Sequence, residues 1–356
     1  NFYYINYHGV VWETTKTYYE SFLPYIRNRE NLKTLQVDML GELNASHLDF
    51  RTSGDEQKTF YEQKTLGTGI IFYNTNPYLV MRFVKKSPID ILDNPIKPGD
   101  ELISVNHKAV DKSKNRNQFF NETEIKEEIL LSFKRGKNVF DLKIHPIDTR
   151  SLNDLLYDEW IAGKQEMVDK ASQNRIAYVY MKDMGTGSLK DFLIDMTTEA
   201  YHKDALILDL RYNRGGNVHD DVLQFLSQKH YLNWKYRNGN LSPQPHFTPG
   251  SKPMVLLINE HSLSDAEMTA EGFKQLHLGK IIGTETYRWI IFTSARMMVD
   301  GSYTRLPAWG CYKLNGDDME KTGVAPDIYI KNTFMDRLNG TDPQLEKAIQ
   351  EILQDL

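Results

Sequence analysis

Apolar residues recur with different spacings along the 356-residue chain, and each spacing predicts a different kind of segment. In residues 1–60 the spacing is three and four positions, which places the apolar side chains on one face of a helix. The residues that show this spacing are Leu32, Leu35, Met39 and Leu43. The stretch 8–23 before them is rich in Trp and Tyr and predicts a second helix packed on the first.

Residues 61–147 contain short runs rich in β-branched and aromatic residues, separated by Pro, Gly and Asn. The runs occupy 69–74, 78–84, 101–106 and 139–145. This pattern is typical of a small β-rich domain. The stretch 122–131 predicts one helix within that domain.

Residues 148–356 alternate predicted strands with predicted helices. Strands are expected at 176–181, 205–211, 253–259, 281–284 and 296–306. Helices are expected at 189–200, 220–226, 265–278 and 343–354. The run 205–211 is almost continuously apolar, as in a strand that is buried on both faces of a sheet. The alternation predicts an α/β fold, in which the polar stretch 237–252 is an exposed loop.

Composition and charge exclude several classes of protein. Lys and Arg total 43 against 48 Asp and Glu, so the net charge of −5 argues against a nucleic-acid-binding surface. No apolar run approaches the ~18–20 residues that span a bilayer, so no membrane insertion is expected. The single cysteine, Cys311, excludes an internal disulfide bond and a cysteine-rich zinc site. Because the chain starts at Asn1 with no signal segment, we expect it to be processed or to be part of a longer protein.

A candidate nucleophile follows the predicted strand at 253–259. Ser264 and Asp265 stand where a short loop opens the next helix. A serine at this junction lies at the carboxyl end of a strand, and the free N–H groups of the first helical turn can hold a developing oxyanion. The alternative interpretation is that Ser264 or Asp265 only caps the helix.

A glycine pair follows the predicted strand at 205–211. Gly215 and Gly216 allow the backbone to approach a ligand closely, or to turn its N–H groups towards an anion. The alternative interpretation of the pair is a tight turn without a functional role.

Two further segments supply a candidate base and a candidate acid. His47 follows Ser46 just beyond the amphipathic helix, and an imidazole is the usual general base for a serine. The chain has 10 histidines, however, so a structural role is the alternative. Glu320 could orient the histidine directly or through the Ser46 hydroxyl, or it could be a solvated surface acid.

Seven segments, taken in order, resemble the tricorn-type serine peptidases of the C-terminal-processing-protease superfamily. They are HG-x-x-W at 8–12, the run ending in GELN-x-SH at 32–47, KPGDELISVN at 97–106, YVYMKDMG at 178–185, LDLRYNRGGNV at 208–218, NEHSLSDAE at 259–267 and GVAPDI at 323–328. The resemblance covers essentially the whole chain. It implies a helical cap over 1–60, an inserted PDZ-like domain over 61–147 and an α/β catalytic core over 148–356. It also implies that the β-propellers of full tricorn proteins lie outside this chain.

The same resemblance implies a catalytic tetrad. In it, Ser264 is the nucleophile, His47 is its general base, and Glu320 orients His47 through Ser46. The backbone N–H groups of Asp265 and of one glycine in the pair form the oxyanion hole, and we assign the glycine to Gly216 with Gly215 as the alternative. This chemistry requires neither a metal nor an organic cofactor.

The sequence departs from the family at the turn that follows β-strand residues 281–284. The stretch 283–290 has no lysine, which favours the histidine-based branch over the Ser/Lys branch. Arg288, Trp289 and Ile290 replace the usual glycine-rich turn, and we expect their bulk to narrow the substrate cleft. Arg214 interrupts what is often a longer glycine run.

The expected partner is a peptide or unfolded polypeptide substrate, with no nucleic acid and no membrane. The stretch 66–72 resembles the carboxylate-binding loop of PDZ domains, in which Gly67 and Gly69 would expose backbone N–H groups to a peptide. The alternative is that this loop is only structural. The resemblance also implies a homo-oligomer and slightly favours a cytoplasmic location, although some relatives are exported. A non-catalytic protein that binds peptides or hydrophobic ligands on the same fold is the alternative function.

Overall fold

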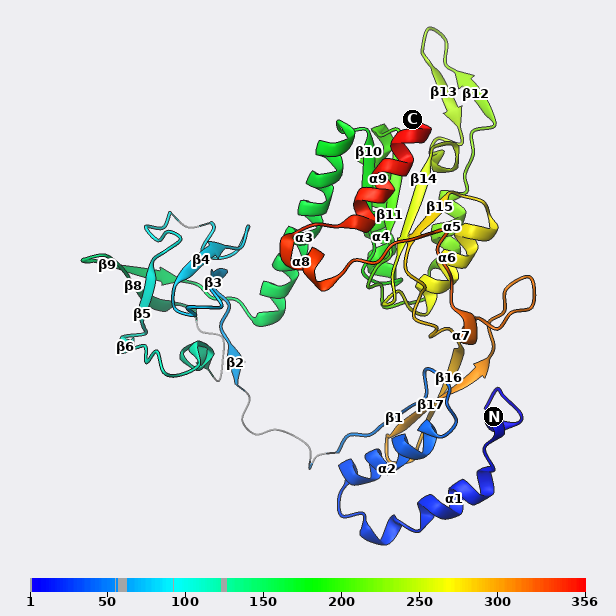
Figure 1. The fold of residues 1–356 in the computed structure, drawn as a ribbon, viewed down its shortest axis with the longest axis horizontal. Helices are drawn as coiled ribbons and strands as arrows, with labels where there is room; N and C mark the ends of the chain where they lie inside the picture. Colours follow the sequence, from blue (N-terminus) through cyan, green and yellow to red (C-terminus); the bar gives the residue numbers. More distant parts are fainter. Residues whose placement is uncertain (1, 55, 57–62, 92, 123–126) are drawn as a thin grey trace. The chain divides into compact units, whose positions relative to one another are not determined.

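The computed structural model describes residues 2–54, 56, 63–91, 93–122 and 127–356 (Figure 1). The chain forms two compact units. One contains Asn1–Gln57 together with Gln165–Leu356, and the other contains Lys58–Lys164. The division into 1–60, 61–147 and 148–356 stays a prediction, and each unit is described by itself.

The first unit is built on a five-stranded sheet with the order β10-β11-β14-β15-β18. The strands are β10 (Ile176–Tyr180), β11 (Ala205–Asp209), β14 (Met254–Ile258), β15 (Lys280–Gly283) and β18 (Ile328–Tyr329). All neighbouring pairs are parallel, with Leu208 opposite Leu256 in the register of the two central strands. Every residue of β11 and β14 is buried, as the continuous apolar runs predict. The parallel sheet confirms the α/β core.

Helices cover both faces of this sheet. They are α3 (Thr149–Ser172), which contains residues of both units, α4 (Thr186–Thr197), α5 (His219–Leu226), α6 (Asp265–Gln275) and α9 (Pro343–Asp355). The short helix α8 (Phe334–Asn339) precedes α9 and has no buried residue. Leu208 and Leu256 belong to a buried cluster that also contains Phe192 of α4 and Phe273 of α6. Because side chains alternate along a strand, the intervening residues face the other side, where α9 contacts β11, β14 and β15 (Figure 1).

The N-terminal segment is helical, as predicted. It contains α1 (Trp12–Glu20) and α2 (Arg29–Gly41). After α2 the chain forms β1 (Asp49–Arg51), which joins a three-stranded antiparallel sheet with β17 (Tyr303–Trp309) and β16 (Phe292–Met297). Leu40, Leu43 and Phe50 are buried together against Leu306 of β17. The pairing of β1 with β17 therefore fixes the position of the residues that immediately precede β1.

The second unit is β-rich, as predicted. Its strands are β2 (Lys64–Thr65), β3 (Ile70–Phe72), β4 (Val80–Phe83), β5 (Glu101–Val105), β6 (Lys108–Ala109), β7 (Asn121–Glu122), β8 (Ile129–Arg135) and β9 (Asn138–Ile144). A four-stranded sheet has the order β6-β5-β8-β9, and two further pairs are β3 with β4 and β2 with β7. Val80, Leu102, Leu131 and Phe133 are fully buried in its core.

Three predicted elements are wrong, and helices α3, α7 (Met319–Thr322) and α8 were not predicted. The stretch 122–131 is not a helix, because Glu122 lies in β7 and Ile129 begins β8, while residues 123–126 lie outside the described part. The stretch 296–306, expected as a single strand, contains the end of β16, a turn and the start of β17, which pair as an antiparallel hairpin. The expected loop at 237–252 contains β13 (Leu241–Gln244), which pairs with β12 (Leu232–Lys235).

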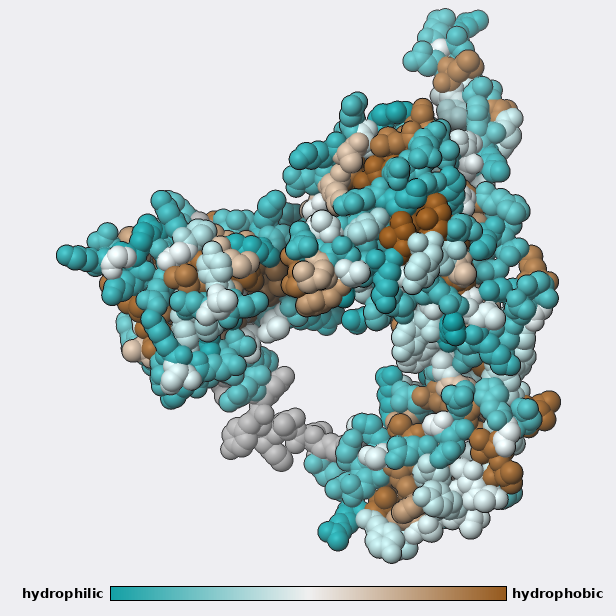
Figure 2. Space-filling view, in the orientation of Figure 1, coloured by the Kyte–Doolittle hydropathy of each residue, from teal (hydrophilic) through white to brown (hydrophobic). Residues whose placement is uncertain are grey.

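No helix within the described residues is long and apolar enough to cross a bilayer. In the view of Figure 2, hydrophilic residues cover most of the visible face, and apolar residues appear in separate patches. Short 3₁₀ turns complete the described elements at Tyr7–Gly9, Leu23–Tyr25, Arg116–Phe120, Ala200–His202 and Pro249–Ser251.

Candidate active site

Ser264 occupies a strained turn between β14 and α6. Its backbone angles are φ 57° and ψ −120°, a region that a side-chain-bearing residue seldom adopts. The turn is held because the Ser264 N–H donates to Glu267 Oε1 at 3.1 Å and the Glu267 N–H donates to the Ser264 carbonyl at 2.9 Å. Ser264 is therefore the N-cap residue of α6, and its capping position also places its hydroxyl at the carboxyl edge of the parallel sheet.

His47 lies against Ser264 although 217 positions separate them in the sequence. Its Nε2 atom is 3.4 Å from Ser264 Oγ. The imidazole ring meets the ring of Trp289 edge to face, with centroids 5.2 Å apart and an interplanar angle of 76°. Burial, and secondarily the positive charge of Arg305, lowers the pKa of His47 from 6.5 to about 4. The ring is therefore neutral near pH 7, which is the form that can accept a proton.

Ser46 and Glu320 continue the hydrogen-bonded series on the other side of the imidazole. His47 Nδ1 is 3.2 Å from Ser46 Oγ, which in turn donates to Glu320 Oε2 at 2.9 Å. Glu320 lies on α7 (Met319–Thr322) and also accepts the backbone N–H groups of Ser46 at 2.7 Å and Ile290 at 3.2 Å. A proton on Nδ1 that points to Ser46 leaves the lone pair of Nε2 facing Ser264.

The glycine pair packs against the Ser264 turn. Gly215 has φ 75°, and a Cβ added there would lie 2.5 Å from the Cβ of Ser264. The Gly215 N–H donates to Asn213 Oδ1 at 2.8 Å. Among the residues that the structure describes, no protein acceptor takes the backbone N–H of Gly216 or of Asp265. Of the two glycines, Gly216 is thus the one whose N–H is not engaged within the protein.

The side chains of Asp265 and Asn213 hold in place the two segments that carry the Gly216 and Asp265 N–H groups, and the sequence analysis did not predict these contacts. The Asp265 carboxylate accepts the backbone N–H groups of Val218 at 2.8 Å and His219 at 3.1 Å, and lies 2.5 Å from His219 Nδ1. This contact with Asp265 raises the pKa of His219. Asn213, which is fully buried, donates its side-chain amide to the Met181 carbonyl at 2.8 Å. No sequence spacing links these segments, so only the fold brings them together.

Glu267 is a third side chain whose role was missed, although its sequence signal was visible. The run Ser264-Asp-Ala-Glu267 has the Ser-x-x-Glu spacing of a helix capping box. The carboxyl group is fully buried, and this burial raises its pKa. It accepts hydrogen bonds from the turn 286–289 as well as from Ser264.

A pocket of about 650 Å³ opens beside His47. Its lining residues include Tyr4, His8, Asn44, Trp289 and Lys321. Tyr287, Arg288 and Trp289 form part of its wall. Of the three bulky residues expected to narrow the cleft, Arg288 and Trp289 line this pocket, whereas Ile290 is buried in the core and does not. Among the described residues, no group of three or more His, Cys, Asp or Glu side chains could hold a metal ion.

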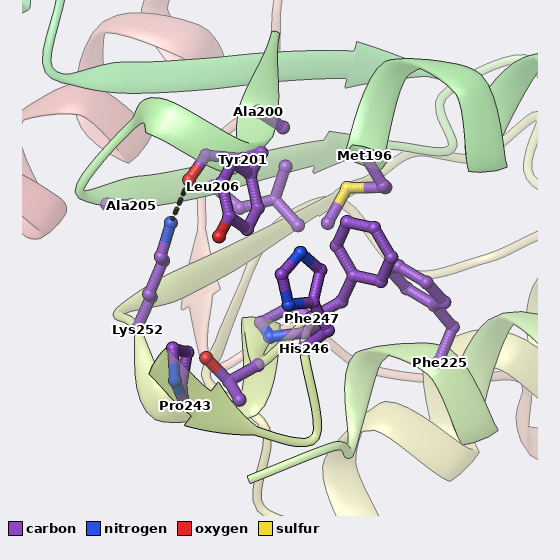
Figure 3. A pocket seen from close by; sticks show the side chains of 12 residues that line it. Met196, Ala200, Tyr201, Ala205, Leu206, Phe225, Pro243, His246, Phe247 and Lys252 are labelled. Atoms are coloured by element: carbon purple, nitrogen blue, oxygen red, sulfur yellow. Dashed lines mark hydrogen bonds between the residues drawn. The ribbon is translucent and has the colours of Figure 1, made fainter. Parts of the chain in front are cut away.

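A second pocket, of about 200 Å³, lies beside the first residues of β11, Ala205 and Leu206 (Figure 3). It is lined mainly by apolar and aromatic side chains, among them Met196, Tyr201, Phe225 and Phe247. The Lys252 ammonium group donates to the Tyr201 carbonyl at 2.9 Å. Because this pocket adjoins the start of β11, whereas Ser264 follows the end of β14, it contains no residue of the Ser264 site.

Gly67 and Gly69 lie in the other unit and are buried. Gly67 exchanges backbone hydrogen bonds with Ile147, at 2.7 Å from its N–H and 2.8 Å to its carbonyl. Gly69 has φ 83°, and a Cβ added there would overlap the Ser87 side chain. The Gly67 N–H is therefore already used within the protein, and the peptide-binding role of this loop stays a prediction.

A hydroxyl, an imidazole and a carboxylate in hydrogen-bonded series at the carboxyl edge of a parallel sheet are the groups of a serine hydrolase. Comparison with family models narrows this class. Residues 175–330 match peptidase family S41, and residues 1–41 match the tricorn protease C1 domain. Both matches support a tricorn-type serine peptidase of family S41, which confirms the resemblance found in the sequence.

Known relatives match more than half of this chain, and some match nearly all of it. The tricorn protease of Thermoplasma acidophilum is 28% identical over 353 residues, covering 95% of this chain and 32% of that protein. The tricorn protease of Thermoplasma volcanium is 34% identical over 202 residues, covering 56% of this chain and 19% of that protein. A crystal structure of the tricorn protease superposes with a TM-score of 0.81 at 25% identity, covering 96% of this chain and 34% of that one. The match thus spans about a third of the length of the first relative and of the solved structure, and about a fifth of the length of the second relative.

Proposed function

We propose that this chain is a serine endopeptidase that hydrolyses peptides or unfolded polypeptides through an acyl-enzyme. The observation that supports the proposal most directly is the 3.4 Å separation between Ser264 Oγ and His47 Nε2. This separation is slightly longer than a good hydrogen bond, and resting-state sites often tighten only when substrate binds.

The proposed reaction has two halves. In the first, His47 Nε2 takes the proton of Ser264 as Oγ attacks the peptide carbonyl carbon, and then passes that proton to the leaving amine. In the second, His47 takes a proton from water, whose oxygen attacks the ester and releases the carboxylic acid. Glu320, acting through the Ser46 hydroxyl, holds the imidazole in the required tautomer and stabilises its positive charge after each proton transfer.

The tetrahedral oxyanion is assigned to the backbone N–H groups of Gly216 and Asp265. Each such donor contributes on the order of 3 kcal/mol to the lowering of the barrier. The engagement of the Gly215 N–H by Asn213 favours Gly216 over Gly215 for this role. No metal or cofactor takes part in the proposed mechanism.

A Ser/Lys mechanism is less well supported. Lys321 lines the pocket beside His47, but its ammonium group is paired with Asp318, at 3.6 Å from Oδ2. The imidazole, in contrast, is neutral and within reach of the Ser264 hydroxyl.

The test is hydrolysis of an unstructured polypeptide such as denatured casein. We expect the wild-type chain to cleave it internally and Ser264→Ala to lose activity by at least about 1000-fold. Ser21→Ala, which removes an exposed hydroxyl at the end of α1, is the matched control and should be fully active. Full activity in Ser264→Ala would overturn the proposal. Peptide binding by a wild-type chain without turnover would instead favour a non-catalytic binding protein.

A further inference from the structure

The Glu267 carboxylate joins the nucleophile turn to a second segment of the chain. Its Oε1 atom accepts the backbone N–H groups of Ser264 at 3.1 Å and Trp289 at 2.8 Å. Its Oε2 atom accepts the Arg288 N–H at 2.9 Å and the Thr286 hydroxyl at 2.5 Å. One buried side chain therefore receives four donors, and three of them come from residues 286–289.

Residues 286–290, here called the strap, connect β15 to β16. Arg288 has φ 69° within it, a conformation that is unfavourable for a residue with a side chain and that must be held by its surroundings. Glu267 supplies that restraint at 286, 288 and 289. Glu320, the acid of the proposed tetrad, accepts the N–H of the last strap residue, Ile290, at 3.2 Å.

The strap also contacts the general base. The Trp289 ring stands edge to face against His47, with 5.2 Å between the ring centroids. The strap is thus hydrogen-bonded through Glu267 to the backbone of Ser264, packed on His47, and hydrogen-bonded to Glu320. Ser264 and His47 are far apart in the sequence. The strap contacts Glu267, which bonds the Ser264 backbone, and Glu320, which bonds Ser46 beside His47.

We propose that Glu267 is a positioning residue that fixes the Ser264 turn and the strap relative to each other, and thereby sets the distance between Ser264 Oγ and His47 Nε2. The inference rests on the proposed peptidase function. A carboxylate suits this role because its two oxygens together accept about four hydrogen bonds, whereas an amide must turn an NH₂ group towards some of the same donors.

The test compares Glu267→Gln with Glu271→Gln in the full chain. Glu271 lies one turn further along α6 and is also buried, and its carboxylate accepts a hydrogen bond from Gln275. Glu267→Gln should lower kcat by about 100-fold, because misplacement of reacting groups by roughly 1 Å has that effect. Its KM should stay within about twofold, because the carboxylate is buried away from substrate. Glu271→Gln should keep both constants.

A fluorophosphonate that labels Ser264 supplies the second readout and the number of folded sites. Per folded site, labelling of Glu267→Gln should slow in parallel with kcat. A structural role alone would lower the melting temperature and the number of sites but leave kcat per site unchanged, and that result would overturn the inference. If Glu267→Gln does not fold, Thr286→Val, which removes one donor to the same carboxylate, should lower kcat by about tenfold. Unchanged kcat in Thr286→Val would then overturn the inference.

The two proposals fail in different ways. If the wild-type chain neither cleaves polypeptide nor labels at Ser264, the proposed function fails and the inference fails with it. If the wild-type chain does both and Glu267→Gln matches it, only the positioning role of Glu267 fails.

Discussion

Ser46 donates its hydroxyl hydrogen to Glu320 Oε2 at 2.9 Å, although the two residues are 274 positions apart. The same hydroxyl oxygen lies 3.2 Å from His47 Nδ1, so a single oxygen atom connects the acid to the imidazole. In the proposed mechanism Glu320 would therefore act on His47 through Ser46. The proposed relay through Ser46 can therefore be tested as directly as the proposed nucleophile, Ser264.

Ser46→Ala should lower kcat by about 100-fold and leave KM nearly unchanged. The alanine removes the acceptor for the Nδ1 proton, so the imidazole is no longer held in the tautomer that faces Ser264. Steady-state kinetics on a defined peptide would measure both constants, with Ser21→Ala as the control. Equal kcat in Ser46→Ala and wild type would show that the relay does not contribute.

The acid limb of the pH profile should report the lowered pKa of His47. Because the base must be neutral, kcat/KM is expected to be maintained as the pH falls from 7 and to be lost as it passes through about 4, rather than through the ordinary value of 6.5. The charge of Arg305 contributes to this lowering, so Arg305→Met should move the limb to higher pH.

Arg296→Met is the control for that shift, since Arg296 is an exposed arginine on β16 and not among the causes of the lowered pKa. Two results together would contradict the assignment of His47 as a buried neutral base. They are a loss of kcat/KM near pH 6.5 in the wild type, and the same midpoint in Arg305→Met.

Gly215→Ala should damage both stability and activity. An alanine at φ 75° is strained, and its Cβ would overlap the Cβ of Ser264 at 2.5 Å. We expect a loss of about 1–3 kcal/mol in the free energy of unfolding and of at least about 100-fold in kcat. Gly187→Ala on α4 has open space around the new methyl group and should change stability by no more than about 1 kcal/mol. Thermal unfolding and kinetics would together test this contrast, and equal behaviour of the two variants would refute it.

Asp342→Ala should be among the most destabilising single changes in the first unit. Asp342 caps α9 and forms a buried ion pair with Arg211, which follows β11, with 2.7 Å between Asp342 Oδ1 and Arg211 Nη1. Its removal leaves a buried arginine less well compensated, at a cost of about 3–5 kcal/mol. Lys16→Ala, which removes an exposed pair with Glu20, should change stability by less than about 1 kcal/mol. A melting temperature of Asp342→Ala equal to that of Lys16→Ala would contradict this.

The sequence was sufficient for the elements whose pattern is local. The central strands were predicted because uninterrupted apolar runs such as 205–211 are typical of a sheet buried on both faces. Helix α3 (Thr149–Ser172) was missed because few of its residues are buried, chiefly Val168 and Ser172, so its apolar positions form no clear stripe. The 122–131 error has a related cause, since periodicity over a short apolar stretch does not separate a strand from a helix.

In the candidate site, too, local motifs could be recognised from the sequence, whereas contacts between distant segments could not. The residue types at Ser264, His47 and Glu320 could be singled out from motifs, and the fold places them within hydrogen-bonding distance through Ser46. The contact of Asp265 with His219 could not be predicted, because it depends on how two helix starts meet in space. For Glu267 the capping-box spacing was present, but its bonds to the strap depend on long-range packing.

Covalent labelling with a fluorophosphonate, followed by mass spectrometry of the intact chain and of its peptides, tests the central assignment most directly. The account predicts one adduct per chain on Ser264, and labelling that is slowed by at least about 100-fold in His47→Ala because the hydroxyl then lacks its base. No adduct on the wild-type chain, an adduct on another residue, or equal labelling rates in wild type and His47→Ala would contradict it.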